Sequence, residues 1–382
     1  MSETQVAYGY LPIQLNPERP LGAAILNEWR QELERGWFTL GPGVERLETA
    51  WAEACGMKHA IGVNSGTDAL IIGLKALGVG PGDKVVTCPN TFVATVGAIV
   101  AVGATPMFVD AGPDYLIDME AVAREMSYTP FKVIIPVDLT GRPVVHRFRE
   151  LAASVVRPFI LRDACQSIGA TYNGSPSARM SDITAYSLHP LKNVHGCGDG
   201  GMVVTDDGKL AERARWLANF CSDKERRYVH EEIGFKYPLT NVQAAIGFAQ
   251  LERIEEIIKR KREIATKYNK LLNGIPGLTL PAELPNVRNV YWMYGILIGK
   301  EFGMSRDKVK EKLKEKGIDT RFFFTGMHKQ PSLQQFPSCR NFYPVSEKLE
   351  KCGLYLPCGM KITNEQQEYV ASTIRELQNR EL

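Results

Sequence analysis

A lysine on a loop rich in proline and glycine is the residue of this chain best suited to covalent chemistry. Lys192 lies in the segment SLHPLKN, residues 187–193, and the glycine-rich run GDGG follows at 198–201. A lysine amine that has lost its proton attacks carbonyl carbon and forms a Schiff base. Ser187, in the same segment, offers a hydroxyl to a phosphate. Most lysines are simply exposed, so the neighbouring residues carry this interpretation.

A small-residue turn upstream has the composition of a phosphate site. Ser65, Gly66 and Thr67 stand between an apolar run, 59–63, and a helical pattern, 68–77. The N–H groups and the dipole at a helix N-terminus bind anions, and glycine lets the backbone approach a phosphate closely. We therefore assign these three residues to phosphate binding. An ordinary helix cap is the alternative.

An acid and two neighbours complete the set of residues that could hold an aromatic ring. Asp163 closes an apolar run that begins at 158, and a buried carboxylate needs a partner. A protonated pyridine nitrogen is such a partner, and Gln166 could donate to a phenolic oxygen of the same ring. Phe92 follows the apolar run 84–88 and could stack on the ring face. A capping aspartate and a core phenylalanine are the alternatives.

The lysine, the anion turn and the acid are together what an enzyme needs to hold pyridoxal 5'-phosphate (PLP) as a Schiff base. We predict that Lys192 is the covalent tether and the general acid and base. Asp163 is predicted to keep the ring nitrogen protonated, so that the ring withdraws electrons.

The elements that must position these residues alternate between strands and helices. Apolar runs alternate with helical patterns between residues 59 and 205, which predicts an α/β fold with a mostly parallel central sheet. Expected strands are 59–63, 84–88, 105–109, 133–137, 159–162, 184–187 and 201–205, with helices at 68–77 and 93–102.

The pattern changes after residue 205. We expect helices at 210–219, 241–273, 305–316 and 364–377, and strands at 291–298 and 320–324. The predicted organisation is a large α/β domain, 1–255, that binds the cofactor and a smaller C-terminal α+β domain, 256–382.

Composition narrows the range of partners. The formal net charge of +3 argues against nucleic acid held by bulk charge, and the most apolar stretch, 92–109, is broken by glycine and proline, which argues against a membrane span. The eight cysteines form no CxxC pair, and residues 1–5 lack the basic and apolar parts of a signal peptide. We therefore expect a cytoplasmic protein, and since the six histidines form no ligand-spaced pair, no metal site is predicted.

Several of these motifs occur together in one known family. The chain resembles the DegT/DnrJ/EryC1/StrS family of PLP-dependent nucleotide-sugar aminotransferases over nearly its whole length. The matching segments are WFTLGP at 37–42, NSGTDAL at 64–70, DACQ at 163–166, the Lys192 motif, LTNVQAA at 239–245 and MHKQP at 327–331.

The resemblance implies a fold and a set of roles. It implies a PLP-dependent transferase of fold type I, acting as a homodimer with shared active sites. By position, Lys192 matches the Schiff-base lysine and Asp163 the partner of the pyridine nitrogen, with Gln166 at the phenolic oxygen. Gly66, Thr67 and Ser187 match phosphate ligands, and Phe92 matches the stacking ring.

One segment departs from the family pattern. The family often has GYNYR where this chain has GFKYP at 234–238. Lys236 stands where an asparagine reaches the phosphate of the partner subunit, and a lysine could bind that phosphate as a point charge. Pro238 removes the arginine. Tyr237 and His328 are the predicted substrate contacts.

The expected substrates follow from two further segments. YWMYGI at 291–296 and LYLPCG at 354–359 resemble the branch that makes perosamine-type 4-amino sugars. We expect L-glutamate as the amino donor and a nucleotide-linked 4-keto-6-deoxyhexose as the acceptor.

Three alternatives remain open. Sugar 3-dehydration is one, although those relatives carry histidine in place of the tether lysine. A ketone without a nucleotide, such as a phosphorylated ketone or a cyclitol, is another, and a catalytically idle binding or regulatory protein is the third. A plain nucleotide-binding protein is disfavoured because GxGxxG and GxxxxGK[ST] motifs are absent.

Overall fold

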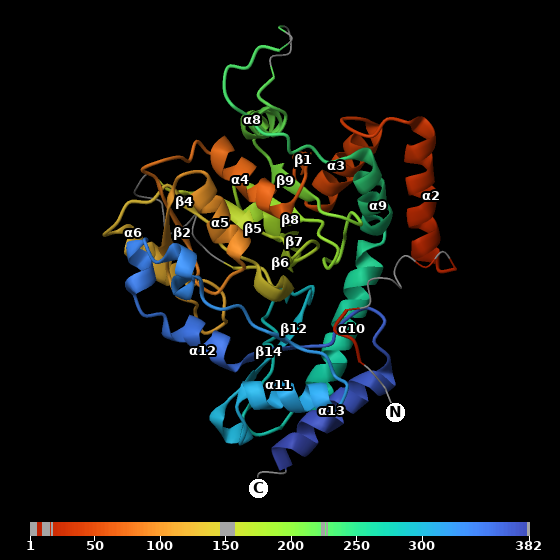
Figure 1. Cartoon of the computed structure of the whole chain (residues 1–382), viewed down its shortest axis with the longest axis vertical. Coiled ribbons are helices and arrows are strands. Elements are labelled where there is room, and N and C mark those ends of the chain that lie inside the picture. The colour runs from red at the N-terminus through yellow and green to blue at the C-terminus, as the bar shows by residue number, and fades with distance from the viewer. Residues whose placement is uncertain are drawn as a thin grey trace.

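The computed structural model describes residues 6–9, 16, 18–145, 157–222, 226 and 228–379 (Figure 1). Residues 1–5, on which the expectation about a signal peptide depends, lie outside the described residues. None of the described helices is both long enough and apolar enough to cross a bilayer.

A seven-stranded sheet forms the centre of the larger unit, in the order β1-β9-β8-β5-β4-β2-β3. Its strands are β1 (His59–Val63), β2 (Lys84–Thr87), β3 (Thr105–Phe108), β4 (Val133–Ile134), β5 (Phe159–Asp163), β8 (Ile183–Ser187) and β9 (Gly201–Thr205). The predicted mostly parallel sheet is confirmed, since β9 alone runs opposite to the other six. The loop that carries Lys192 joins β8 to β9 without a crossover helix, and such a connection makes neighbouring strands antiparallel.

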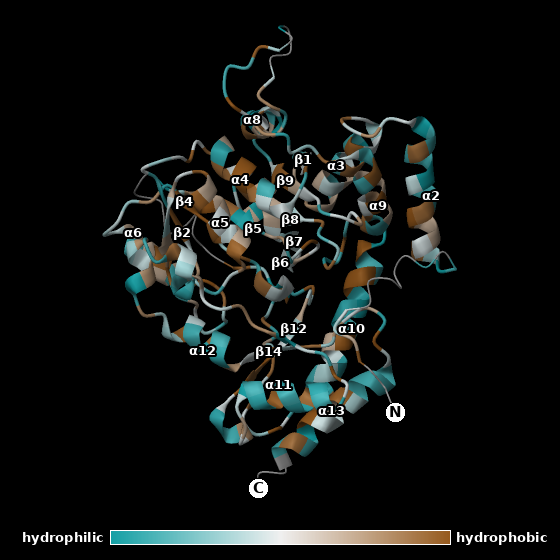
Figure 2. Cartoon of the chain, viewed as in Figure 1, coloured by the Kyte–Doolittle hydropathy of each residue, from teal (hydrophilic) through white to brown (hydrophobic). Residues whose placement is uncertain are grey.

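Both faces of this sheet are covered by helices. The helices α4 (Gly66–Ala76), α5 (Val93–Ala101) and α8 (Gly208–Ala218) share one hydrophobic cluster with the sheet, while α3 (Pro42–Ala54) and α9 (Asn241–Leu251) share another. Figure 2 shows α4 and α5 mostly brown where they lie over the strands. Val133 and Ile134 of β4 lie in different clusters, as the two-residue period of a strand requires. An outer helix, α2 (Pro20–Arg35), packs on α9.

The predicted strand 133–137 is wrong beyond residue 134. Pro136 has no N–H to donate to a ladder, and beyond it the pairing continues as an isolated bridge from Val137 to Asp163. The carbonyl of Pro136 accepts a hydrogen bond from the Asp163 N–H at 2.9 Å, which ties the end of β5 to this segment.

The predicted single helix 241–273 is also wrong, because it is two helices. α9 ends at Leu251 and α10 (Ile254–Leu272) begins after Arg253, whose φ of −112° and ψ of 19° leave the helical region. The break lets α9 pack on α2 and α3 while α10 packs on α13 (Asn364–Asn379).

The smaller unit is built on a four-stranded antiparallel sheet in the order β10-β12-β14-β13. Its strands are β10 (Leu278–Thr279), β12 (Tyr294–Ile298), β14 (Gly353–Leu356) and β13 (Arg321–Phe322), and α11 (Arg306–Glu315) covers it together with α10 and α13. β12 starts three residues later than predicted, and Tyr291 ahead of it has a positive φ of 48°. β13 is likewise shorter than the predicted 320–324.

The hydrophobic clusters support the proposed division of the chain. The cluster of the smaller unit contains buried residues from Ile264 to Leu377 together with Val6 from the N-terminal segment. We propose the boundary near residue 255, at the start of α10, with residues 1–255 and 256–382 as the two domains. Helix α12 (Pro344–Cys352) returns to the larger unit, where Leu349 joins the cluster at the β2–β4 edge.

One further helix and a small sheet remain. Helix α6 (Met119–Met126) shares a hydrophobic cluster with β2 and β4. A small three-stranded sheet has the order β11-β6-β7, with β6 (Thr171–Tyr172), β7 (Ser175–Pro176) and β11 (Val287–Arg288).

Candidate active site

The predicted cofactor residues lie at one edge of the central sheet. Ser65 follows β1, Phe92 follows β2, and Asp163 and Ser187 are the last residues of β5 and β8. The carboxyl ends of parallel strands share one edge, and ligands of open α/β sheets bind there.

The turn predicted to bind phosphate brings Gly66 against Ser187. A Cβ atom added at Gly66 would lie 2.7 Å from Cβ of Ser187 and 3.0 Å from Sγ of Cys165. Ser65 caps α4, since its Oγ accepts a hydrogen bond from the Asp68 N–H at 3.0 Å. Only glycine leaves the first N–H of α4 open beside the Ser187 hydroxyl.

The Asp163 carboxylate is buried and held by neighbouring donors. Only 6% of the residue is exposed. Thr95 Oγ1 on α5 donates to Oδ2 at 2.7 Å, and the Cys165 N–H donates to Oδ1 at 3.2 Å. Each carboxylate oxygen has two lone pairs, so both retain capacity for a further donor such as a pyridinium N–H.

The orientation of the Gln166 carboxamide follows from one contact. Its Oε1 accepts a hydrogen bond from the Thr140 N–H at 2.7 Å. A backbone N–H can only donate, so the atom facing Thr140 is the oxygen and the NH2 group points elsewhere. Gln166 thus retains two donors for a ligand oxygen.

Lys192 lies in a partly buried environment made by the smaller unit. Its Nζ is 4.0 Å from the centre of the Trp292 ring, and the indole N–H donates to the Leu191 carbonyl at 2.8 Å. Burial lowers the pKa of the Lys192 amine below its ordinary value, and the nearby Cys165 and Asp163 oppose that shift. A lowered pKa increases the fraction of free amine, which is the form that attacks a carbonyl.

These residues fit PLP. The space at Gly66 and Ser187, which a side chain would fill, suits the phosphate. The buried Asp163 has spare acceptors and suits the ring nitrogen. The Lys192 amine is close enough to that acid to be affected by its charge, and it suits the aldehyde. Phe92 completes the set, with 50% of its surface exposed and its ring centre 5.5 Å from that of Phe324. Thr67 is half-buried in the first turn of α4.

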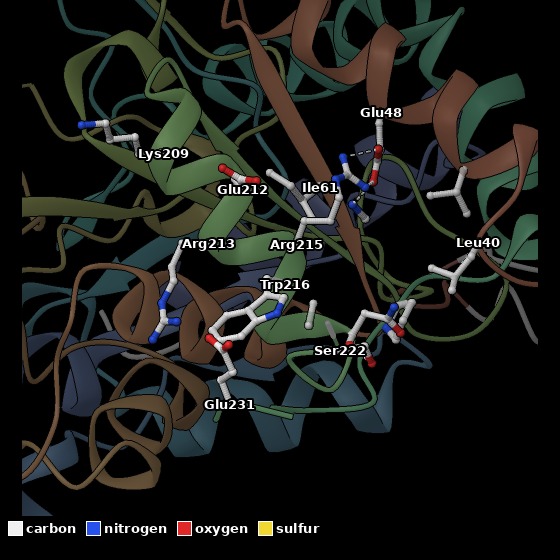
Figure 3. A pocket seen from close by; sticks show the side chains of 15 residues that line it. Leu40, Glu48, Ile61, Lys209, Glu212, Arg213, Arg215, Trp216, Ser222 and Glu231 are labelled. Atoms are coloured by element: carbon white, nitrogen blue, oxygen red, sulfur yellow. Dashed lines mark hydrogen bonds and ion pairs between the residues drawn. The ribbon is translucent and has the colours of Figure 1, made fainter. Parts of the chain in front are cut away.

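Lys236 and Tyr237 lie on an extended segment beside the start of α4. The Tyr237 carbonyl accepts a hydrogen bond from the Asn64 N–H at 2.7 Å, and burial, with a further contribution from Asp68, raises the pKa of the tyrosine. Lys236 Nζ is 5.5 Å from the centre of the Phe220 ring. Pro238 and Asn219 line a pocket of about 750 Å³ over α8, which contains neither Lys192 nor Asp163 (Figure 3).

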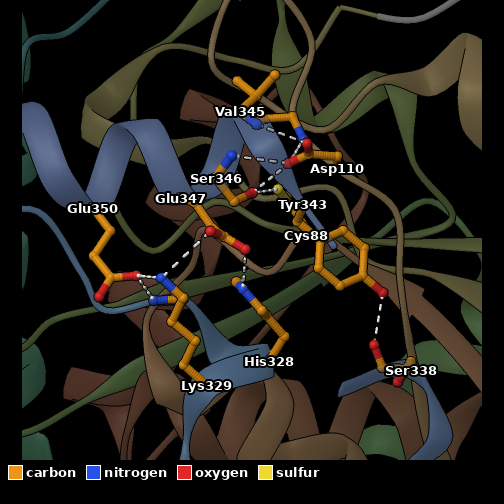
Figure 4. Close-up of polar contacts among 12 residues, drawn as sticks. Cys88, Asp110, His328, Lys329, Ser338, Tyr343, Val345, Ser346, Glu347 and Glu350 are labelled. Carbon is orange, nitrogen blue, oxygen red and sulfur yellow. Dashed lines mark hydrogen bonds and ion pairs between the residues drawn. The ribbon is translucent and has the colours of Figure 1, made fainter. Parts of the chain in front are cut away.

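His328 lies in a cluster of polar side chains with Lys329, Tyr343, Glu347 and Glu350 (Figure 4). Its ring centre is 5.0 Å from that of Tyr343, and its Nε2 is 3.4 Å from Oε1 of Glu347. Burial lowers the pKa of His328, and Glu347 opposes that shift. Its described ring contacts are with other side chains of the protein, so its role as a substrate contact stays a prediction.

The cluster around His328 fastens the segment 325–352 to the large sheet. Asp110 accepts hydrogen bonds from the N–H groups of Val345 and Ser346 at the start of α12, at 2.9 and 3.0 Å. The Met327 N–H donates to the Pro89 carbonyl at 2.9 Å. Phe324, directly before this segment, lies 5.5 Å from Phe92 between ring centres, so the cluster supports one wall of the site.

Sequence reasoning missed Thr95, Thr140 and Trp292. Thr95 had a signal, because it is a polar residue in the otherwise apolar helix 93–101. Trp292 and Thr140 had none, since their relation to Lys192 and Gln166 depends on contacts between segments far apart in the chain. In the described part of the chain, no three His, Cys, Asp or Glu side chains form a group that could hold a metal ion.

Comparison with known proteins agrees with this geometry. The sequence pattern of the DegT/DnrJ/EryC1/StrS aminotransferase family matches residues 20–375. The chain is 34% identical over 339 residues to GDP-perosamine synthase of Caulobacter vibrioides, covering 87% of this chain and 89% of the relative. It is 32% identical over 378 residues to the spore coat polysaccharide biosynthesis protein SpsC of Bacillus subtilis, covering 94% and 95%.

A solved structure gives the same result at the level of the fold. S. venezuelae DesV in complex with a ketimine intermediate matches with a TM-score of 0.91 and 33% identity, covering 98% of this chain and 99% of that chain. The sequence match and the fold agree over nearly the whole chain. The chain therefore belongs to the DegT/DnrJ/EryC1/StrS aminotransferase family, and it is a PLP-dependent aminotransferase of fold type I.

Proposed function

We propose that the chain transfers the amino group of L-glutamate to a nucleotide-linked keto sugar, with a 4-keto-6-deoxyhexose as the acceptor. The observation that carries the proposal is the convergence of Lys192, Asp163 and the Gly66 cradle at one sheet edge, in a chain similar to a GDP-perosamine synthase. The segments 291–296 and 354–359, which resemble the perosamine-type branch, pair with each other as β12 and β14.

The proposed roles follow the contacts of each residue. When bound, PLP supplies a carbon that accepts and returns an amino group and a ring that withdraws electrons. Lys192 holds the cofactor and moves a proton at the α-carbon of the donor, and burial favours its free amine. Asp163, fixed by Thr95, binds the ring nitrogen.

The remaining cofactor residues bind its other groups. Ser65, Gly66, Thr67 and Ser187 surround the phosphate, where the N-terminus of α4 adds its dipole. Phe92 packs on the ring and the Gln166 NH2 group donates to the phenolic oxygen. Tyr237 and His328 remain the proposed substrate contacts.

We propose a homodimer in which Lys236 reaches the phosphate of the partner subunit. The support is a set of exposed apolar side chains in the segments 37–40 and 220–233, both of which also supply lining residues of the α8 pocket: Trp37, Phe38, Leu40, Phe220, Tyr228 and Ile233. Ile233 is 91% exposed, and such a patch favours association. Mixing inactive Lys192→Ala with inactive Lys236→Ala subunits tests this, because hybrid dimers with one intact shared site should regain activity. No regain in verified hybrids would contradict sharing.

We propose a cytoplasmic location because the cysteines form no disulfides. All eight cysteines are free, as expected in a reducing compartment. Thiol titration of the protein extracted under conditions that block exchange tests this, and disulfides in the native material would contradict it.

The tether assignment is tested by spectroscopy. The purified protein should be yellow, and Lys192→Ala should lose both the colour and its sensitivity to borohydride. Lys267→Ala is the matched control, because this half-buried lysine on α10 pairs with Glu368 at 2.7 Å and lies away from the site. If the absorbance band of the wild-type protein persists in Lys192→Ala, the assignment of Lys192 as the tether is wrong.

The acceptor is tested with a panel of keto sugars carrying different nucleotides. Each is incubated with L-glutamate and the holoenzyme, and the product mass is measured. A mass change that matches replacement of the keto oxygen by an amine supports the proposal. Turnover of a phosphorylated ketone or cyclitol, with none of any nucleotide sugar, would refute it.

A further inference from the structure

A small pocket beside Lys192 is lined by nitrogen donors and has no acid. This pocket of about 60 Å³, called the amine pocket here, lies between the Lys192 loop, α10 and the smaller unit. Trp292 forms an apolar wall, and the lining side chains with polar atoms or sulfur include those of Tyr8, Lys192, Asn193, Lys261 and Cys358. No lining residue in the described part of the chain is an aspartate or a glutamate.

Lys261 places a buried positive charge in this wall. The residue is 6% exposed, and its Nζ donates to the Cys358 carbonyl at 2.8 Å and lies 3.8 Å from the Cys358 Sγ. Within the described residues no ion pair joins it to a carboxylate. A buried charge without a counter-charge is costly, so a buried ammonium beside an open space favours an anion there.

Asn193 adds a second, independent donor. The residue is 7% exposed, and its Nδ2 has no hydrogen-bond partner among the described residues. Buried amide donors are nearly always satisfied, and each unsatisfied one points to a missing ligand or water. The indole N–H of Trp292 donates to the Leu191 carbonyl and the Tyr8 hydroxyl donates to Sδ of Met293 at 2.7 Å. Apart from the predicted tether Lys192, the side-chain donors left for a ligand are therefore those of Lys261 and Asn193.

The size and position of the amine pocket select the kind of anion. About 60 Å³ leaves room for a few waters or for one small anion such as a carboxylate. In the proposed reaction Lys192 moves a proton at the α-carbon of the donor, and the α-carboxylate is one bond from that carbon. The carboxylate must therefore lie within a few bond lengths of the Lys192 amine.

We propose that the amine pocket binds the α-carboxylate of the amino-acid donor, with the Lys261 ammonium and the Asn193 NH2 group as its ligands. The inference rests on the proposed function for the identity of the donor. It assigns donor recognition to this protomer's own residues, in a chain where Pro238 stands in place of an arginine.

The test measures binding of an inert dicarboxylate to the holoenzyme. Glutarate has the chain length of glutamate and cannot react, so its dissociation constant is measured by calorimetry for wild type, Lys261→Met and Lys261→Arg. Charge-assisted hydrogen bonds of this kind predict a loss of about 10-fold to 100-fold in Lys261→Met, with recovery in Lys261→Arg. The KM for L-glutamate in the donor half-reaction should rise in parallel.

Controls separate a local effect from a general one. Lys267→Met removes an ammonium from the same helix as Lys261 that pairs with Glu368 and does not line the pocket, so it should bind glutarate as wild type does. GDP and inorganic phosphate are titrated as well, and their affinities should be unchanged in Lys261→Met. If Lys261→Met does not fold, Asn193→Asp keeps the shape and adds a negative charge, and it should weaken glutarate binding at least as much.

Several results would overturn the inference. Unchanged glutarate affinity in folded Lys261→Met, or in Asn193→Asp when Lys261→Met does not fold, would mean that the pocket holds no donor carboxylate. Loss of GDP affinity with glutarate binding intact would assign the pocket to the nucleotide, and no glutarate binding by wild type would also refute it. If no nucleotide sugar is aminated while glutarate binding still depends on Lys261, the proposed acceptor fails and the pocket assignment stands.

Discussion

Adding one methyl group at Gly66 tests the phosphate cradle most directly. In Gly66→Ala the new Cβ would lie 2.7 Å from Cβ of Ser187, whereas ordinary contact begins at 3.4 Å, so the first turn of α4 and the end of β8 must separate by 3.4 − 2.7 = 0.7 Å. Overpacking of this kind costs about 1–3 kcal/mol, and the helix preference of alanine over glycine offsets about 0.5–1 kcal/mol. We expect a net loss of about 1 kcal/mol in the free energy of unfolding, within a range of about 0–2.5 kcal/mol.

The loss of cofactor affinity should be larger than the loss of stability suggests. In the proposed site the phosphate binds where the N–H groups of α4 meet the Ser187 hydroxyl, so a separation of 0.7 Å would lengthen both sets of hydrogen bonds. Losing one or two charge-assisted bonds weakens PLP binding by about 10-fold to 100-fold. The dissociation constant is measured by absorbance titration of the apoprotein, and the stability by urea unfolding.

Gly97→Ala is the matched control. A Cβ at Gly97, in the middle of α5, meets nothing within 4 Å, so this variant should gain about 0.5–1 kcal/mol and bind PLP as wild type does. Wild-type PLP affinity in Gly66→Ala would refute the reasoning, because the cradle would then not be where the phosphate binds.

Other substitutions test the acid, the wall of the lysine site and a buried histidine. Thr95→Val keeps the side-chain shape but removes the donor to Asp163, and it should weaken PLP binding about 10-fold in the same titration; unchanged affinity would mean that the threonine does not support the acid. Trp292→Leu should let water reach Lys192 and move its lowered pKa back toward the ordinary value, so that apoprotein captures PLP only at higher pH; capture with the wild-type pH dependence would contradict this. Burial lowers the pKa of His195 to about 4, so the folded state binds fewer protons than the unfolded state between pH 4 and 6.5, and stability falls as pH falls through that window. The loss from pH 7 to pH 5 is about 2 kcal/mol by linkage, and urea unfolding of His195→Gln should lack it; equal losses in both proteins would rule out this histidine as the cause.

The local units of the fold were predictable because their signals lie close together in the chain. β1 and β9 have the bounds that the apolar runs predict, and α4 begins within two residues of its expected start. The turn at Ser65 to Thr67 is a strand-to-helix junction whose capping residue and glycine are adjacent. Such patterns depend on backbone preferences and two-residue or helical periodicity, which neighbouring residues determine.

Errors occurred where distant packing overrides local preference. The run 241–273 has helical composition throughout, and only the need to pack on two units breaks it at Arg253. The sequence shows Pro136, but it does not show which neighbouring strand an N–H at that position would face. The effect of the proline on the length of β4 therefore depends on the tertiary structure. β9 runs antiparallel because the loop around Lys192 is used for the site and leaves no crossover helix.

The sequence alone therefore determined the chemistry: Lys192, the acid at 163 and the turn at 66 are individual groups whose types and spacing carry the inference. The tertiary structure decided what surrounds them, because Trp292 over the lysine, Thr95 on the acid and Lys261 in the amine pocket come from segments far apart in the chain. Burial and the pKa values that follow from it arise only when those segments pack together, and no local pattern records them.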